Sequence, residues 1–128
     1  MKEKAATMSF CPRYHHAVEL IGRRWTGAIL REMYGGTTRF SDIASSVPGL
    51  SDRLLSERLK ELEVEGVVVR IVYPETPVRI EYRLTDKGHD LGRVMDEIAK
   101  WAGRWLDDFP DEECEKLAEH ELIGSARH

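Results

Sequence analysis

The hydrophobic periodicity of this sequence changes twice, and these two changes limit the folds that the chain can adopt. Up to Gly66 the apolar residues recur at the spacing of amphipathic helices. Residues 67–84 alternate with the period of two that is typical of β-strands, and helical spacing returns from Thr85 onward. We therefore expect an α+β fold, mainly α, in which helices precede and follow one pair of strands.

The part of the chain before Gly66 predicts four helices. Pro12 opens a short first helix over residues 12–22, and a second, core-facing helix follows over residues 25–34. Residues 37–40 have an extended character and lead into a two-turn helix. The fourth helix, over residues 51–64, begins after the tight turn at Pro48 and Gly49, with Ser51 as its N-cap.

Residues 67–73 and 78–84 are predicted to form a β-hairpin around a turn that contains two prolines. In the second strand we expect Ile80, Tyr82 and Leu84 to face the core, and Arg79, Glu81 and Arg83 to face solvent. Thr85 then caps a long helix, and a short acidic helix is expected over residues 111–122. This order predicts a winged helix-turn-helix with a two-stranded β-wing and terminal helices.

A chain of 128 residues is expected to form one domain, residues 1–128. Within it we expect a first helix at 12–22, a core with its wing at 24–84, and C-terminal helices at 85–122. No apolar run approaches the roughly 18 residues of a membrane span, and the first residues lack the apolar stretch of a secretory signal. We therefore expect a cytoplasmic protein without membrane contact.

The net charge of −4 is unevenly distributed along the chain. Residues 1–38 carry six Lys and Arg against three acids, whereas residues 84–128 carry six against twelve. This distribution excludes a wholly basic, non-specific polyelectrolyte binder, because such a binder needs cations over its whole surface. It leaves room for a local basic face in the first two-thirds of the chain.

The helix at 51–64 has two dissimilar sides. On a helical wheel Leu55, Leu59 and Leu62 form a buried stripe, and the opposite side carries Arg53, Glu57 and Lys60, with Ser56 at the margin. Donors on that side match what a recognition helix presents to a DNA major groove. Arg58 lies near the leucine stripe, so we expect it to pack along the core edge and pair with an acid. The alternative interpretation is a solvated amphipathic surface helix.

The predicted wing adds cations of its own. Arg79 and Arg83 lie on the solvent side of the hairpin, and Arg79 is close to the tip at residues 74–79. A protruding cationic hairpin can follow the DNA backbone into an adjacent groove. A solvated sheet face is the alternative for both arginines.

The chain resembles the HxlR family of bacterial winged helix-turn-helix regulators, which are relatives of the MarR group. The resemblance runs from about residue 11 to residue 106 and is carried by CP at 11–12, LIGRRWT at 20–26, ILRE at 29–32, RFSDI at 39–43, PGLS at 48–51, LSERLKELEVEG at 55–66 and YRLTDKG at 82–88. It implies a transcriptional regulator that binds operator DNA as a homodimer, with the terminal helices forming the dimer.

Two sets of site residues follow from these observations. We expect the operator, a pseudo-palindrome with two half-sites, to be contacted by Ser51, Arg53, Ser56, Lys60, Arg79 and Arg39. We expect the dimer interface to contain Tyr14, Val18, Ile98, Trp101 and Trp105. The two tryptophans exceed what a small monomer needs for its own core, although packing of one of them on the first helix is the alternative.

Cys11 lies directly before Pro12, where the helix dipole and nearby Arg13 favour a thiolate. The resemblance implies that Cys11 senses oxidants or electrophiles. An inert, partly buried thiol is the alternative, and a small-molecule effector fits the sequence equally well. Cys114 lies among acids and is a poor sensor candidate, with a disulfide to Cys11 of a second copy as the alternative role.

No cofactor, metal site or enzymatic activity is expected. Cys11, His15 and His16 supply too few ligands for a tetrahedral metal site, and no Gly-rich phosphate loop or nucleophile elbow occurs in the chain. The competing function is a winged-helix protein–protein interaction module without DNA specificity.

Overall fold

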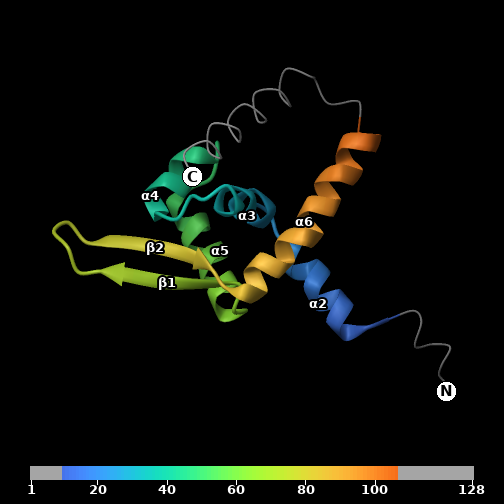
Figure 1. Ribbon diagram of the computed structural model, residues 1–128, viewed down its shortest axis with the longest axis horizontal. Coiled ribbons are helices and arrows are strands. Elements are labelled where there is room, and N and C mark those ends of the chain that lie inside the picture. The colour runs from blue at the N-terminus through green and yellow to red at the C-terminus, as the bar shows by residue number, and fades with distance from the viewer. Residues whose placement is uncertain (1–9, 107–128) are drawn as a thin grey trace.

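The computed structural model describes residues 10–106. Within them the chain forms five helices and one antiparallel two-stranded sheet (Figure 1): α2 (Pro12–Ile21), α3 (Thr26–Tyr34), α4 (Phe40–Ser46), α5 (Asp52–Val64), β1 (Val68–Tyr73), β2 (Arg79–Leu84) and α6 (Asp86–Trp105). The predicted mainly helical winged helix-turn-helix is confirmed, with element boundaries within one or two residues of those expected. The predicted helix at 111–122 lies outside the described residues.

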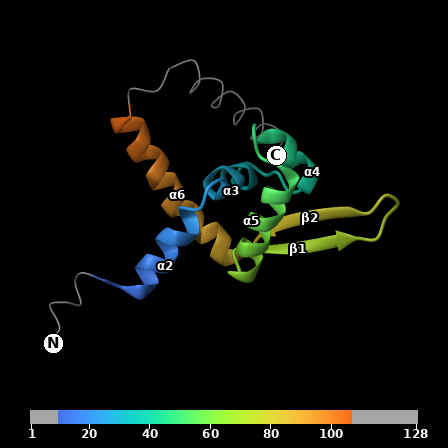
Figure 2. The same ribbon diagram turned by 180° about the vertical axis from the view of Figure 1, so that it is seen from behind.

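The elements are arranged in three parts. Helices α3, α4 and α5 form a central group, the hairpin projects from one side of it, and α2 and α6 project from the other (Figures 1 and 2). Within the described part of the chain, no helix combines the length and the apolar composition that crossing a bilayer requires. The molecule therefore has one packed centre and two projecting ends.

The core lies in the central group and at the base of the hairpin. Its buried apolar side chains come from positions 29 to 82: Ile29, Leu30, Met33, Ile43, Val47, Leu50, Leu55, Leu59, Leu62, Val67, Val68 and Tyr82. Helix α2 buries none of its residues, and the only buried residue of α6 is Gly88. Burial therefore holds the helix-turn-helix together and leaves the first and last described helices largely uncovered.

The hairpin register brings Val68 opposite Leu84 and Tyr73 opposite Arg79. A short extended segment lies beside β2, because Arg39 forms an isolated bridge with Glu81 and the Tyr82 amide donates to the Thr38 carbonyl over 2.8 Å. The extended character predicted for residues 37–40 is thus confirmed up to Arg39, whereas Phe40 is already the first residue of α4. This segment continues the sheet by one bridge at the edge nearest α4.

The prediction that Glu81 faces solvent was wrong, since this residue is only 6% exposed. Its carboxylate lies 3.0 Å from Arg83 Nη2 and 3.4 Å from Arg79 Nε. The extended segment at Arg39 lies beside its strand. A charged group can be buried at modest cost when partners of opposite charge accompany it, and two guanidinium groups do so here.

Helix α6 starts with a tight junction to the rest of the fold. The Thr85 hydroxyl caps the helix by accepting from the Gly88 amide over 3.1 Å, as the sequence predicted, and it donates to the Gly66 carbonyl over 2.5 Å. A Cβ at Gly88 would collide with the Val67 carbonyl, so only glycine fits this approach. The Tyr34 hydroxyl donates to the Gly88 carbonyl over 2.7 Å, and burial raises the pKa of Tyr34 to about 12.

Candidate nucleic-acid interface

The turn before α5 sets the direction of this helix. Gly49 has φ of +85°, a left-handed conformation that favours glycine, and a Cβ added to it would come within 3.3 Å of the Trp25 ring. Trp25 itself has φ of 77°, which is why α3 starts one residue later than predicted. Leu50 is buried in the core, and its packing there holds the turn between α4 and α5 in place.

Helix α5 is anchored along one side and open along the other. Leu55, Leu59 and Leu62 are 0% exposed, and the Ser51 hydroxyl accepts from the Leu54 amide over 3.1 Å, which confirms the predicted N-cap. The side chain of Arg53 is 89% exposed and lies 3.3 Å from Glu57, one turn along the helix. An ion pair as exposed as this one is weak, so the guanidinium can exchange its partner at small cost.

The remaining predicted contacts of α5 are also on the surface. Ser51, Ser56 and Lys60 are exposed, as is Arg39, which directly precedes α4. Among residues 10–106, Lys60 and Arg39 form no salt bridge. The structure thus brings Ser51, Arg53, Ser56 and Lys60 together on one helix, whereas Arg39 belongs to a neighbouring element.

Arg58 belongs to the scaffold, as predicted from its position on the wheel. Its side chain is 11% exposed, Nε donates to the Arg24 carbonyl over 2.9 Å, and Nη1 lies 3.0 Å from Glu61. Glu61 also lies 3.1 Å from Arg23. These contacts connect the middle of α5 to the turn between α2 and α3, so the outward side of α5 keeps a fixed orientation.

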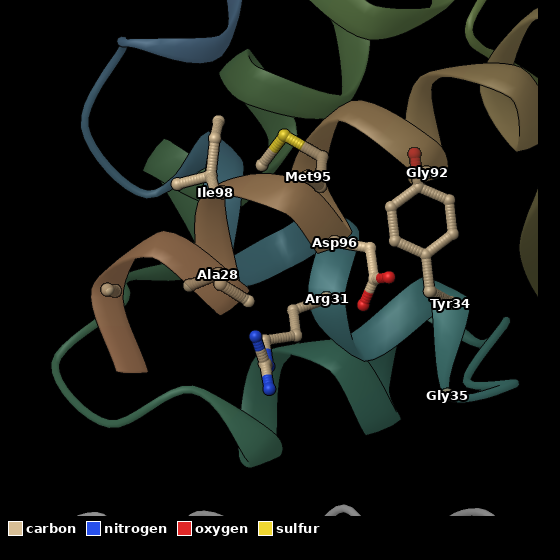
Figure 3. Close-up of a pocket in the computed structure, with 11 residues that line it drawn as sticks. Ala28, Arg31, Tyr34, Gly35, Gly92, Met95, Asp96 and Ile98 are labelled. Atoms are coloured by element: carbon tan, nitrogen blue, oxygen red, sulfur yellow. The ribbon is translucent and has the colours of Figure 1, made fainter. Parts of the chain in front are cut away.

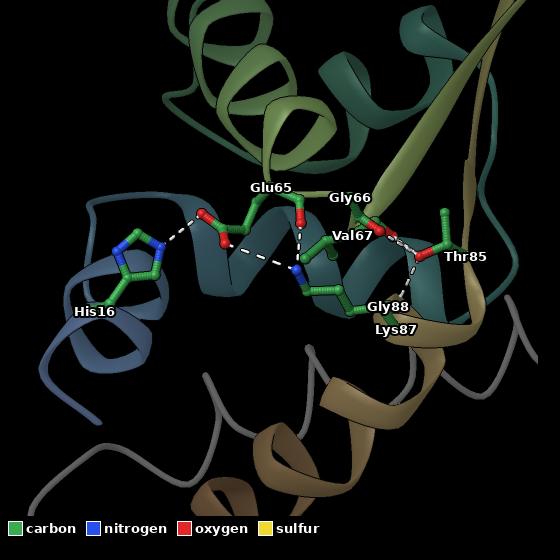
Figure 4. A network of polar contacts seen from close by, with 7 residues as sticks. All are labelled: His16, Glu65, Gly66, Val67, Thr85, Lys87 and Gly88. Atoms are coloured by element: carbon green, nitrogen blue, oxygen red, sulfur yellow. Dashed lines mark hydrogen bonds and ion pairs between the residues drawn. The ribbon is translucent and has the colours of Figure 1, made fainter. Parts of the chain in front are cut away.

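A second polar network holds the end of α5 (Figure 4). The Glu65 carboxylate lies 2.7 Å from His16 Nε2, and Lys87 Nζ donates to the Glu65 carbonyl over 2.6 Å. His16 belongs to α2 and Lys87 to α6, so both projecting helices contact the last turn of α5. A lysine on a terminal carbonyl also satisfies an acceptor that the helix itself leaves unpaired.

The cations of the wing are largely neutralised within the wing. Arg79 is 29% exposed, lies 3.2 Å from Glu75 and 3.4 Å from Glu81, and its guanidinium stands 4.1 Å from the centre of the Tyr73 ring. Arg83 donates to Glu81, and this hydrogen bond raises the pKa of its guanidinium. The charge that the sequence places at the wing is thus less available than the positions alone suggest.

Arg70 is a surface cation that the sequence reasoning passed over. It lies on β1 opposite Tyr82, is exposed, and forms no salt bridge within the described range. A single cation inside the apolar run at residues 67–73 was the available signal. It gives the hairpin one positive charge without a carboxylate partner.

Cys11 is an exposed free thiol at the N-cap position of α2. Its carbonyl accepts from the His15 amide over 2.9 Å, so the residue is tied to the first turn through its backbone. Among the described residues, no three His, Cys, Asp or Glu side chains come close enough together to hold a metal ion. Cys114 lies outside the described residues.

The residues predicted for a dimer interface are exposed on α2 and α6. Tyr14 is 72% and Val18 is 42% exposed, and the corresponding values are 46% for Ile98, 51% for Trp101 and 68% for Trp105. Both tryptophans keep half or more of their surface exposed. Leu20 of α2 and Leu91 and Met95 of α6 pack against the core, whereas the five residues predicted for the interface remain exposed.

Three comparisons with known proteins agree with this geometry. The family model described as HxlR-like helix-turn-helix matches residues 20–109. The uncharacterized HTH-type transcriptional regulator YvaP of Bacillus subtilis is 56% identical over 97 residues, which cover 76% of this chain and 90% of YvaP. The HTH-type transcriptional regulator YodB of the same organism is 41% identical over 99 residues, which cover 77% of this chain and 88% of YodB.

Solved structures of two regulators have the same fold. The reduced form of YodB matches with a TM-score of 0.69 at 40% identity, covering 79% of this chain and 99% of YodB. The redox regulator HypR in its reduced form matches with a TM-score of 0.70 at 30% identity, covering 74% of this chain and 94% of HypR. YodB has also been solved after diamide treatment and bound to a quinone, and HypR in an oxidised form.

The matched region contains the helix-turn-helix, the wing and all of α6. The relatives are named as transcriptional regulators and not as enzymes. The chain belongs to the HxlR-like helix-turn-helix family of transcriptional regulators.

Proposed function

We propose that this protein acts in the cytoplasm as a homodimer that binds a pseudo-palindromic operator in double-stranded DNA. In this proposal α5 enters the major groove and the wing at residues 74–79 follows an adjacent groove. Two copies related by a two-fold axis present two α5 helices, which demands half-sites about one helical turn or a multiple apart.

The outward side of α5 is the observation that carries the proposal. Arg53 and Lys60 are exposed there, while three leucines with no exposed surface anchor the opposite side. Arg53 has the donor geometry for a guanine edge, and the hydroxyls of Ser51 and Ser56 suit phosphates or bases. Sequence is therefore read mainly by Arg53, with Lys60 and Arg39 on the DNA backbone.

The wing supplies less affinity than its two arginines suggest. Arg79 must leave Glu75 or Glu81 before it can meet a phosphate, whereas Arg70 has no such carboxylate within the described residues. Because each neutralised phosphate contributes to affinity, a paired arginine adds little. Each subunit then binds DNA modestly, and the dimer is needed for useful affinity.

We infer the signal from Cys11 and from the relatives. The solved forms of YodB and HypR include diamide-treated, quinone-bound and oxidised states. Cys11 is an exposed free thiol at the N-cap position of α2, where a reagent can reach it. In our proposal an oxidant or electrophile modifies Cys11 and thereby changes operator affinity, with a non-covalent small effector as the alternative signal.

The salt dependence of binding to duplex DNA tests this function. We expect affinity to fall steeply with salt, with a slope of about −0.9 for each phosphate neutralised, and footprinting to reveal two protected half-sites. A protein–protein interaction module predicts weak or absent DNA binding even at low salt. Mild oxidation should change operator affinity in the natural chain and not in Cys11→Ser, whereas equal responses would remove the thiol signal.

A further inference from the structure

The positive charge in the first part of the described chain comes from a few arginines. Residues 10–38 contain four arginines and no lysine. Arg13 lies on the projecting helix α2, and Arg31 lines the pocket between α3 and α6 (Figure 3). Arg23 and Arg24 occupy the turn between α2 and α3, and this turn contacts α5.

The turn between α2 and α3 lies along one edge of α5. Arg58 Nε donates to the Arg24 carbonyl over 2.9 Å. Glu61, three residues further along α5, lies 3.1 Å from Arg23. On the helical wheel, Arg58 and Glu61 both fall between the buried leucines and the outward side that carries Arg53. The turn therefore borders the outward side of the recognition helix.

The two arginines of this turn differ in what holds their side chains. Arg23 is paired with Glu61. Arg24 is exposed and forms no salt bridge among residues 10–106, and its guanidinium carbon lies 5.0 Å from the centre of the Trp25 ring. A contact with an aromatic ring orients a guanidinium without a carboxylate beside it. Arg24 thus keeps a positive charge that no acidic side chain of the described chain neutralises.

Trp25 gives Arg24 a fixed support close to the start of α5. Trp25 packs against the core, and its ring reaches the turn before α5, where a Cβ at Gly49 would come within 3.3 Å of it. The Arg24 backbone is held by Arg58 and its side chain by Trp25. A side chain held in this way loses little conformational freedom when it binds a ligand.

We propose that Arg24 binds a phosphate of the operator backbone that runs beside α5. The inference rests on the proposed function and adds a DNA contact from outside both the helix-turn-helix and the wing. A helix in the major groove lies between two phosphate backbones, so an exposed cation at the edge of its outward side comes next to one of them. A phosphate contact carries no base information, so Arg24 adds affinity and orients α5 without changing the preferred sequence.

Salt titration of DNA binding tests this contact in the full chain with Arg24→Gln. Glutamine keeps part of the stem over Trp25 and removes the charge. Affinity is measured for the operator and for a short duplex of unrelated sequence. We expect both affinities to fall by about tenfold at about 50 mM salt and by about fourfold at about 200 mM, because the salt slope becomes less steep by about 0.9.

Two further variants separate a phosphate contact from a structural role. Arg23→Gln is the matched control, because it makes the same charge change at the adjacent residue, whose guanidinium is already paired with Glu61. It should leave the salt slope as in the natural chain. Arg24→Lys keeps the charge and should restore the slope, which would stay lowered if the guanidinium only supported Trp25. Circular dichroism of the three variants controls for folding.

The outcomes distinguish this inference from the proposed function. If the natural chain binds DNA and Arg24→Gln keeps its salt slope, or if Arg23→Gln changes the slope equally, the phosphate contact is overturned and the regulator function stands. A slope that Arg24→Lys does not restore, or a loss confined to the operator duplex, also contradicts a phosphate contact. If the natural chain shows no salt-dependent DNA binding, both are overturned.

Discussion

Helices α5 and α6 are both amphipathic, yet they differ in how far their apolar residues are buried. In α5 the leucines at 55, 59 and 62 are 0% exposed, whereas in α6 Ile98, Trp101 and Trp105 are 46%, 51% and 68% exposed. A helix whose apolar side is covered by its own chain has only its polar side left for an external partner. A helix whose apolar side is open gains free energy by burying that side against a second copy.

The lysines on the polar sides of the two helices differ in whether a carboxylate pairs with them. Lys100 on α6 lies 3.3 Å from both Asp96 and Glu97 of the same helix, and the hydrogen bond that it donates to Asp96 is the main cause that raises its pKa. Lys60 on α5 forms no such pair within residues 10–106. Lys60 is thus open to a phosphate, whereas Arg53 on the same side of α5 must first leave its weak, exposed pair with Glu57.

The largest effect is expected from removing an anchor of α5. Leu59→Ala should lower the free energy of unfolding by about 2–5 kcal/mol, because the residue has no exposed surface and its loss leaves a cavity. Urea unfolding at a fixed protein concentration measures this. Val64→Ala, 82% exposed on the same helix, is the control and should change stability little; equal losses would contradict the assignment of the anchored side.

Substitutions on the exposed apolar side of α6 should change the dimerisation constant and leave the folding of the monomer intact. Trp101→Ala is expected to weaken dimerisation by about 2 kcal/mol or more, since a buried tryptophan is a frequent hot spot. Sedimentation gives the dimer constant, and circular dichroism confirms that the monomer stays folded. Arg104→Ala should leave dimerisation unchanged. If the Trp101→Ala monomer were unfolded, Trp101 would be a residue of the core and not of the dimer interface.

A smaller effect is expected where α6 joins the central group. Tyr34→Phe removes a hydrogen bond to Gly88 and should cost about 0.5–1.5 kcal/mol. The pKa of Tyr34 is raised to about 12 from 10.0, so the folded state holds the proton more tightly than the unfolded state. Its contribution is complete below pH 10 and is lost as the pH rises through about 12, so wild type and Tyr34→Phe should converge in stability across that window.

The smallest effect is expected at the network on the end of α5. Glu65→Gln should reduce the free energy of unfolding by less than about 1 kcal/mol, since His16 is largely exposed and exposed pairs are weak. Glu63→Gln on the exposed side of the same helix serves as the reference. A loss of several kcal/mol would show that α2 is held to α5 far more tightly than an exposed pair allows.

Periodicity predicted most of the fold because each helix and strand has a local signature. The leucine stripe, the Ser51 cap and the scaffold role of Arg58 follow from spacing within one helix. Partners distant in the sequence could not be predicted in the same way. His16 meets Glu65 across 49 positions, and the burial of Glu81 depends on an extended segment at Arg39 that lies beside β2 only in the folded chain.

The wing illustrates the same limit for the candidate site. Alternation correctly put Arg79 and Glu81 on one side of β2, but it could not show that the two side chains would pair or that Arg79 would stack on Tyr73. A cation is available to DNA only if the rest of the surface leaves it unpaired. That property belongs to the tertiary arrangement and not to any local pattern.

The double variant Arg53→Ala with Lys60→Ala tests the central claim, that the covered helix reads DNA while the open helix forms the dimer. Operator affinity and the dimer constant are measured on the same preparation, with Arg93→Ala plus Lys100→Ala on α6 as a control of equal charge change. We predict an affinity loss of about 1–3 kcal/mol, a salt slope lowered by about 1 and an unchanged dimer constant. Unchanged operator affinity, or loss of dimerisation together with DNA binding, would contradict the claim.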